Sequence, residues 1–197
     1  MYFSFIRPPF PAWQPHIGQI GCHAIIADNL SEKCTFAPTE NRTKERIKTE
    51  NGKMDNDEKY MREAIAQAML AYEEDEVPVG AVITCGGKTI ARAYNMTERL
   101  RDPTAHAEMQ AITMATEYLG GKYLGDCEIY VTVEPCPMCA AALGWAQVRR
   151  VVYGASDPKK GFSLYAPSLL HPKTEVRAGV LEEECGKIMS DFFKGKR

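Results

Sequence analysis

Two short motifs contain the residue types in this chain that could do chemistry. The first is His106-Ala107-Glu108, and the second, about 30 residues later, is Pro135-Cys136-Pro137-Met138-Cys139. Cys136 and Cys139 lie three positions apart, so in a first helical turn they share one face. Backbone N–H groups at a helix start favour thiolates, the form of cysteine that zinc binds. One histidine and two cysteines make the ligand count of a catalytic zinc, whose fourth position is left for water.

Glu108 is the carboxylate that could move protons at such a centre. Bound zinc lowers the pKa of its water toward 7 and so makes hydroxide available at neutral pH. Glu108 lies two positions after His106, and on a regular helix residues i and i+2 point about 200° apart. The two side chains can therefore serve one site only if that site adjoins the helix start, where the backbone on both sides can face it.

Each piece also has a simpler interpretation. A structural zinc would need a fourth protein ligand, and the candidates are Cys85, Cys127, Cys185 and His171, none of which lies in a recognisable ligand pair. A C-x-x-C motif alone also serves redox sites, a histidine before a helix is commonly a cap or a core residue, and an isolated glutamate is commonly a solvated charge. The combination is specific, because H-x-E followed by P-C-x-x-C is the signature of zinc deaminases.

The elements around the motifs alternate between helix and strand. Pro103-Thr104 precedes a predicted helix over Ala105–Tyr118, which Gly120-Gly121 closes, and Pro137 opens a small-residue helix that runs to about Ala146. This alternation predicts an α/β layered sheet. Residues 155–174 are predicted as loop. A first helix is indicated by the apolar stripe Met61, Ala64, Ile65, Ala68, Met69 and Tyr72, and a last helix by Leu181, Cys185, Ile188, Met189 and Phe192. The predicted strands are Val77–Ile83, Thr89–Tyr94 (after a Gly86-Gly87 turn), Glu128–Thr132, Val151–Tyr153 and Glu175–Arg177.

Residues 55–197 resemble the cytidine-deaminase-like superfamily and, within it, the bacterial tRNA-specific adenosine deaminases. The resemblance implies a three-layer α/β/α sandwich with a central mixed sheet of about five strands. It also implies that adenosine at the wobble position of a tRNA anticodon is converted to inosine. Besides the two motifs, the segments that carry the resemblance are Glu76–Val82, Asn95, Asp102–Glu108, Gly154–Asp157 and Ser190–Phe193.

The resemblance also assigns roles to single residues. It implies that His106, Cys136 and Cys139 hold one Zn²⁺ with a bound water or hydroxide. It implies that Glu108 takes a proton from that water and delivers it to the base and to the leaving ammonia, while hydroxide attacks C6 of adenine. The implied substrate contacts are the side chain of Asn95 and the backbone of Ala107 at the base edge, Val79 against the base face and Asp157 near the ribose.

The substrate contacts keep structural alternatives. Asn95 also suits a turn at a strand end, Val79 also suits the core, and Asp157 lies in a Ser-Asp-Pro turn where aspartate commonly caps the backbone. The segment from Met96 to Leu100 departs from the family pattern. Substrate specificity is therefore open at this point of the chain.

Charge limits how the chain could hold RNA. The chain has 197 residues and a formal net charge of −2, which excludes binding of nucleic acid by bulk positive charge and requires a local patch. Candidate RNA contacts are Lys159, Lys160, Phe193, Lys194, Lys196 and Arg197. Because Phe192 and Phe193 are neighbours on a helix, one is expected to enter the core and the other to face a base or a neighbouring chain.

Further expectations concern partners and location. The resemblance implies an anticodon stem-loop as partner and a homodimer. No stretch approaches the about 18 consecutive apolar residues of a membrane-spanning helix. Seven cysteines, an odd number that includes a C-x-x-C pair, indicate a metal or redox site in a reducing compartment, and we expect a cytoplasmic protein.

Three functions remain open at this stage. The first is the tRNA-editing deaminase, and the second is a deaminase of a free base or nucleoside of the guanine or cytosine type. The third is a zinc-stabilised binding subunit without activity, against which Glu108 argues. We expect residues 54–197 to form the deaminase domain. Residues 1–53, rich in proline and then in charge, are expected to be an N-terminal extension that is disordered or results from a start assigned upstream of Met54, with a targeting segment or an ordered appendage as alternatives.

Overall fold

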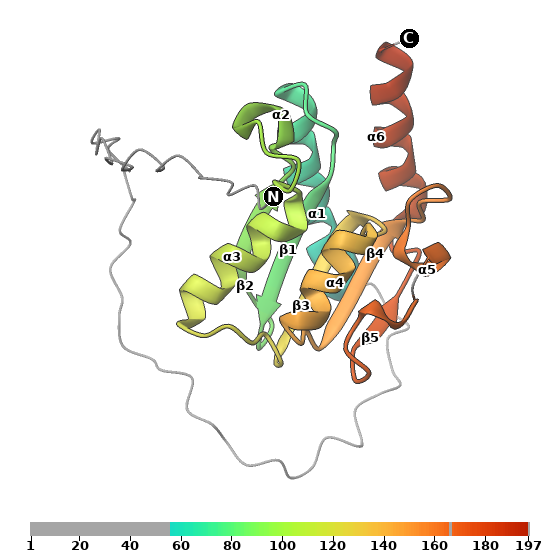
Figure 1. Cartoon of the computed structure of the whole chain (residues 1–197). Helices are drawn as coiled ribbons and strands as arrows, with labels where there is room; N and C mark the ends of the chain where they lie inside the picture. The colour runs from blue at the N-terminus through green and yellow to red at the C-terminus, as the bar shows by residue number, and fades with distance from the viewer. Residues whose placement is uncertain (1–55, 166, 197) are drawn as a thin grey trace, which may run out of the picture. The chain divides into compact units, whose positions relative to one another are not determined.

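The computed structural model describes residues 56–165 and 167–196 and is built on a five-stranded sheet with strand order β2-β1-β3-β4-β5 (Figure 1). β1 pairs antiparallel with both β2 and β3, whereas β3 pairs parallel with β4 and β4 with β5. The sheet is therefore mixed. The strands are β1 (Gly80–Cys85), β2 (Lys88–Tyr94), β3 (Cys127–Val133), β4 (Arg150–Ala155) and β5 (Glu175–Arg177).

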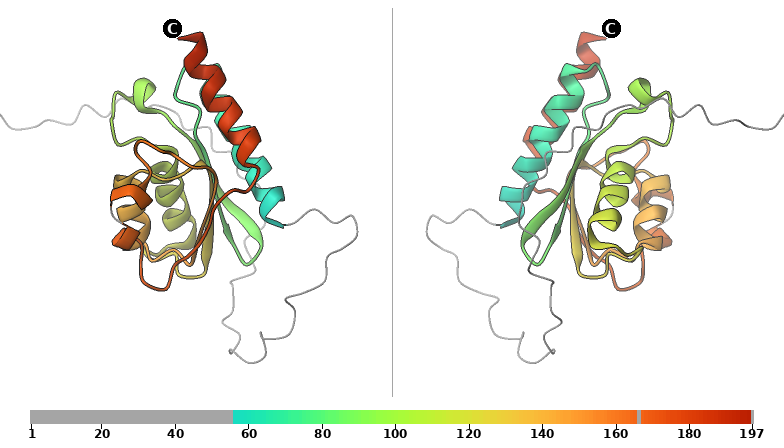
Figure 2. Two further views of the ribbon diagram at one scale, coloured as in Figure 1. Left: turned by 90° about the vertical axis from the view of Figure 1, so that its right-hand side faces the viewer. Right: turned by 90° about the vertical axis from the view of Figure 1, so that its left-hand side faces the viewer.

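Helices cover both faces of this sheet. Figure 2 shows α1 (Asn56–Glu73) and α6 (Glu182–Gly195) on one face, with α3 (Ala107–Leu119) and α4 (Pro137–Trp145) on the other. Figure 2 also places the short α5 (Phe162–Tyr165) on the side of α3 and α4. The three-layer α/β/α sandwich with a mixed sheet of five strands, expected from the sequence, is confirmed.

The two faces of the sheet have separate apolar cores, because successive residues of a strand point to opposite faces. In β1, Ala81 and Ile83 pack with α3 and α4, while Val82 between them packs with α1. Gly80 has no side chain because α1 lies directly against it: a Cβ there would overlap the backbone of Ala64. Close helix–sheet contact at this point holds β1, and with it the start of the site, in place.

The first helix confirms part of the predicted stripe, since Met61, Ala64 and Ala68 are fully buried, but the rest of its buried face differs. Met69 and Tyr72 are 40% and 37% exposed, whereas Asp57 and Tyr60 are buried. The apolar spacing indicates the helix correctly but cannot show that its first turn lies over Tyr130 and Arg150, which give the Asp57 carboxylate partners inside the protein. Asp57 therefore joins the first turn of α1 to the sheet, besides placing a negative charge at the start of the helix.

The remaining differences lie in connecting segments. β1 begins at Gly80 rather than Val77, since Pro78 has no N–H to donate to the sheet. The segment predicted as loop contains α5 and the 3-10 turn η1 (Pro167–Leu169), and α2 (Thr97–Leu100) was not predicted. The Gly86-Gly87 turn and the Gly120 helix end are confirmed, with φ values of 58°, 78° and 64°.

Some expectations lie outside the described residues. They include the interpretation of residues 1–53 as an extension and the placement of Arg197. Of the helices that the structure describes, none combines the length and the apolar character that crossing a membrane would require.

Candidate active site

The starts of α3 and α4 bring the two motifs together. His106 immediately precedes α3, and Cys136 immediately precedes α4. The Nδ1 atom of His106 lies 3.6 Å from Sγ of Cys136 and 3.5 Å from Sγ of Cys139. Zinc bonds to sulfur and nitrogen are about 2.3 and 2.0–2.1 Å long, so a tetrahedral zinc would hold N and S about 3.5 Å apart. The three side chains have the spacing that this metal needs.

Local sequence explains why both ligands stand at helix starts. His106 and Cys136 have extended backbones, with ψ of 154° and 166°, and helical geometry begins at the next residue in each case. Pro137 occupies the first helical position of α4, where its missing N–H costs nothing. Before α3, the Asp102 carboxylate accepts hydrogen bonds from the N–H and the hydroxyl of Thr104, which fixes the turn that leads into His106.

The candidates for a fourth protein ligand do not join this group. Within the described part of the chain, the metal-ligand group consists of His106, Cys136 and Cys139, whose ligand atoms all lie within 4.8 Å of one another. Cys85 and Cys127 face each other across β1 and β3, and Cys185 is a residue of α6 that is buried in the core on the α1 and α6 side of the sheet. His171 lies in the loop before β5. A ligand set of three leaves a coordination position for water or substrate.

The two thiols differ sharply in acidity. Hydrogen bonds from Cys139 and His106 lower the pKa of Cys136 to about 4, despite its burial. The pKa of Cys139 is raised, because it donates its proton to Cys136 and is itself buried. The hydrogen bond with Cys136 also raises the pKa of His106. Cys136 is therefore a thiolate at neutral pH, and a divalent cation would take the place of the proton that the two thiols share.

Glu108 lies inside the site rather than on the helix surface. It is only 3% exposed, although it stands in the first turn of α3. Burial, followed by the negative charge of Cys136, raises its pKa to about 7. Although residues i and i+2 of a regular helix point in different directions, His106 and Glu108 can face one site here, because His106 lies before the helix and Glu108 within its first turn. A carboxyl group with this pKa can both accept and release a proton near neutral pH.

Two of the predicted substrate contacts directly flank β1 and β2. Asn95 is 5% exposed, follows β2 directly and donates its backbone N–H to the carbonyl of Val79, 3.0 Å away. Val79 is partly buried and packs against the larger core. The N–H of Met96 donates to the carbonyl of Ala105 at 3.0 Å, which joins this segment to the start of α3. Ala107 is fully buried at that start. Their contacts with a base stay predictions.

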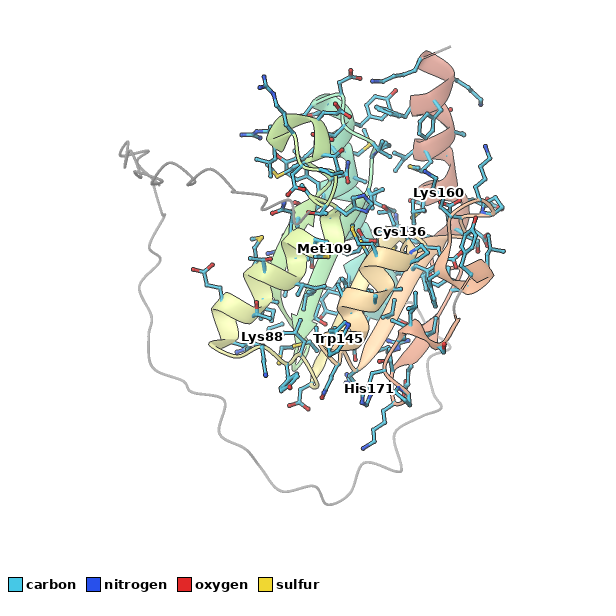
Figure 3. The ribbon with its side chains drawn as sticks, in the orientation of Figure 1. Lys88, Met109, Cys136, Trp145, Lys160 and His171 are labelled. Atoms are coloured by element: carbon cyan, nitrogen blue, oxygen red, sulfur yellow. The ribbon has the colours of Figure 1, made fainter. Side chains whose placement is uncertain are left out.

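Asp157 shapes the loop that carries two candidate RNA contacts. Its carboxylate accepts the backbone N–H groups of Lys159 and Lys160 at 2.9 and 3.1 Å, the capping role that was the structural alternative. Its contact with a ribose stays a prediction. Figure 3 shows Lys160 at the same end of the sheet as Cys136, with Trp145 and Lys88 at the other end.

The end of α6 carries the remaining candidate RNA contacts. Phe192 is 6% exposed and Phe193 is 47% exposed, which confirms that one of the two enters the core. Lys196 forms an ion pair with Asp75 at 2.7 Å, and Lys194 lies 3.7 Å from Asp191. These two lysines are therefore partly neutralised.

Two buried glutamates hold the loops around the site and were given no role from the sequence. Glu134 accepts the N–H of Asp157 at 3.1 Å and that of Ser163 at 3.1 Å. Gly161 must be glycine, since a Cβ there would overlap the Glu134 carboxylate. Glu76 accepts three hydrogen bonds from the segment after β2. Each glutamate adjoins a proline-containing motif in the sequence, a signal too weak to separate it from a surface charge.

Comparisons with known proteins agree with this geometry. Residues 54–155 match the family described as the cytidine and deoxycytidylate deaminase zinc-binding region. The chain is 48% identical over 149 residues to the tRNA-specific adenosine deaminase of Bacillus subtilis (strain 168), an alignment that covers 73% of this chain and 92% of the relative.

Solved structures show the same likeness. One, from a study of A-to-I editing by tRNA:A34 deaminases at the wobble position of transfer RNA, superposes with a TM-score of 0.62 and 44% identity, over 66% of this chain and 98% of the other. The guanine deaminase of Nitrosomonas europaea, at 22% identity and a TM-score of 0.59 over 68% and 83% of the two chains, shares the fold.

Proposed function

The chain belongs to the cytidine and deoxycytidylate deaminase zinc-binding family, among its tRNA-specific adenosine deaminases, and we propose that it hydrolyses adenosine to inosine at the wobble position of a tRNA anticodon. One observation carries the proposal. His106, Cys136 and Cys139 meet at two helix starts beside the buried Glu108, in a chain that covers almost the whole of its deaminase relative.

The chain's own residues account for the proton movements. A zinc held by His106, Cys136 and Cys139 would supply a nucleophile by lowering the pKa of a water. Glu108 takes the proton released as oxygen bonds to C6 of adenine and delivers it to ring N1. Glu108 then takes the proton of the new C6 hydroxyl group and passes it to the 6-amino group. The C6–N bond breaks, the C6 carbonyl forms and ammonia leaves, so adenosine and water give inosine and ammonia. A carboxyl pKa of about 7 suits both the uptake and the release of that proton.

The proposed RNA contacts come from two elements. The loop with Lys159 and Lys160 lies at the Cys136 end of the sheet, and Phe193 is exposed on α6. An unpaired anticodon loop lets a base turn into a pocket at small cost. Because Lys194 and Lys196 already contact acidic side chains, Lys159 and Lys160 are the stronger candidates for phosphate contacts.

We also propose a homodimer through the outer face of α3 and α4. Met114 of α3 and Trp145 of α4 are 45% and 84% exposed, and α3 and α4 are in contact. Leu164 of α5, which also contacts α4, is 57% exposed. Aromatic and methionine side chains of this kind are enriched in protein interfaces. Light scattering of the full chain should give the mass of a dimer, and Trp145→Glu should give that of a monomer.

A deamination assay with the full chain tests the proposed function. The zinc-loaded protein receives an anticodon stem-loop with adenosine at the wobble position and, separately, guanine, cytosine, adenosine and cytidine. We expect inosine in the RNA and no reaction of the free compounds. Turnover of a free base with intact RNA would refute the editing function while leaving the hydrolytic site in place. No turnover of any substrate by protein with one zinc per chain would favour the binding-subunit interpretation.

The free thiols bear on location. Cys85, Cys127 and Cys185 are unpaired in the structure, as are Cys136 and Cys139. Cysteine thiols stay reduced in reducing compartments such as the cytoplasm, and the proposed tRNA substrate would be available to the protein there. We therefore propose a cytoplasmic protein.

A further inference from the structure

Glu76 is a fully buried carboxylate beside the proposed substrate site. It is 0% exposed and lies between α1 and β1. Its Oε2 accepts hydrogen bonds from Nδ2 of Asn95 at 3.2 Å and from the hydroxyl of Thr97 at 3.1 Å, and its Oε1 accepts the backbone N–H of Arg99 at 2.8 Å. One carboxylate thus holds the whole segment that follows β2.

The hydrogen atoms in this cluster fix which way the Asn95 amide points. An ionised carboxylate only accepts, so the NH₂ group of Asn95 must face Glu76. The Thr97 hydroxyl donates to Glu76, and its oxygen accepts the second N–H of Asn95 at 3.1 Å. Both N–H bonds of the amide are therefore used. Among the described residues none donates to Oδ1 of Asn95, which is the remaining polar atom of that side chain.

The carboxylate is held in its charged form. Burial opposes ionisation of Glu76, but the N–H groups of Arg99 and its neighbours and the Thr97 hydroxyl outweigh it, so the pKa of Glu76 lies below its ordinary value. A charged Glu76 cannot donate to Oδ1 of Asn95, and turning the amide round would set this oxygen against the Glu76 carboxylate, so that one acceptor faces another.

We propose that Glu76 is a positioning residue that orients Asn95 so that its carbonyl oxygen, and not its NH₂ group, meets the substrate. The inference rests on the proposed function of the site, since it was this function that placed Asn95 at the base edge. It adds a specificity rule: the substrate atom that meets Asn95 must be a hydrogen-bond donor. The donors that an adenosine offers are its 6-amino group and its ribose hydroxyls.

An exchange of the two functional groups tests the orientation. Asn95→Asp alone sets two carboxylates against each other, and Glu76→Gln alone lets the introduced amide donate to Oδ1 and turn the Asn95 amide round. In each single variant we expect kcat/KM on the anticodon stem-loop to fall about 10- to 100-fold, because a displaced substrate contact can cost about 10²-fold. The double variant Glu76→Gln/Asn95→Asp restores one donor facing one acceptor, and we expect it to recover at least tenfold.

Glu74→Gln is the matched control. Glu74 holds the same segment through Arg99, at 3.1 Å, and the end of β2 through the hydroxyl of Tyr94, at 3.0 Å, but it forms no hydrogen bond with Asn95. We expect its kcat/KM to stay within about threefold of the wild type. All variants are compared at equal zinc content. A loss in Glu74→Gln as large as that in Glu76→Gln would show that the segment, and not the amide, matters, and would overturn the proposal.

A second readout does not depend on activity. The NMR signal of the Asn95 side-chain amide, identified by its loss in Asn95→Asp, should be protected from hydrogen exchange in the wild type and in Glu74→Gln. In Glu76→Gln its exchange should be at least about tenfold faster. Free exchange in the wild type overturns the positioning role, even if the RNA is deaminated. A protected amide in a protein that deaminates no RNA would refute the proposed function and leave the orientation supported.

A substrate with 2′-deoxyadenosine at the wobble position identifies the donor. If the 6-amino group meets Oδ1, the ratio of wild-type to Glu76→Gln activity is the same on both substrates. If the ribose 2′-hydroxyl meets it, that ratio falls toward one on the deoxy substrate. Failure of the double variant to recover on either substrate shows that Asn95 does not act as an acceptor, and overturns the proposal.

Discussion

Two buried carboxylates occupy equivalent places in two helices and behave in opposite ways. Asp57 lies in the first turn of α1 and Glu108 in the first turn of α3, and they are 4% and 3% exposed. The pKa of Asp57 is lowered: burial opposes its ionisation, but hydrogen bonds and charge from Arg150, with Tyr130 and Arg177, outweigh it. The pKa of Glu108 is raised to about 7 by burial and by Cys136.

The partners explain the difference. Arg150 binds both oxygens of Asp57, at 2.8 and 2.7 Å, and Arg177 also pairs with it. Those contacts hold α1 to the first residue of β4 and the last residue of β5. Glu108 has thiols beside it and no arginine pair among the described residues. The two carboxylates are equally buried, but Asp57 stays charged beside arginines and anchors the helix, whereas Glu108 lacks such cations and can carry a proton.

The largest expected effect separates the two groups by rate. Glu108→Gln should lower the rate of RNA deamination by at least about 10³-fold, because proton transfer by a positioned group contributes about 10²–10⁴-fold. Single-turnover measurement at equal zinc content checks this. A residual rate within tenfold of the wild type would mean that Glu108 moves no proton.

The next effect appears in the metal-free protein as a pH dependence of stability. The pKa of the Glu108 carboxyl group is about 7 in the folded state and about 4.3 in the unfolded state. The free energy of unfolding therefore falls as the pH rises between these two values. Glu108→Gln removes that cost, so it should stabilise the protein by about 3 kcal/mol at pH 8 and by little at pH 4. Urea unfolding at the two pH values measures it, and an equal gain at both would contradict the raised pKa.

Asp57→Asn should act in the opposite direction. The lowered pKa of Asp57 gives stability that is present above its unfolded pKa and is lost as pH falls through its folded pKa. The variant should lose about 2 kcal/mol at pH 7, because Arg150 and Arg177 keep their charges without this partner. Urea unfolding tests this, while kcat/KM per folded, zinc-loaded molecule should stay near the wild-type value. A large fall in that value would remove the contrast between the two carboxylates.

The smallest expected effect concerns the loop beside the metal end. Lys159→Ala and Lys160→Ala should each lower kcat/KM on RNA severalfold at low salt and make its logarithmic salt dependence shallower by about 0.7. Lys88→Ala, at the opposite end of the sheet in Figure 3, is the control and should change neither quantity. An equal effect of all three changes would point to net charge alone.

Much of the fold could be predicted because local patterns dominate it. The strand alternation, the Gly86-Gly87 turn and the Gly120 helix end follow from residue type and spacing, and each is confirmed. The strand β5 was also expected, although it has only three residues. The short helices α2 and α5 were missed, since four residues carry too little periodicity to indicate a helix.

The sequence by itself determined the chemistry of the centre: one histidine, two cysteines and a carboxylate at a spacing that zinc hydrolysis uses. Only the tertiary structure decided which carboxylate would be charged. Asp57, Glu76, Glu108 and Glu134 are all acidic residues near predicted elements, and nothing in their spacing separates them. The pKa shifts of Asp57, Glu76 and Glu108 depend on Arg150, Arg99 and Cys136, which lie far from them in sequence or in separate elements. Electrostatic energy depends on distance in space, and folding alone sets those distances.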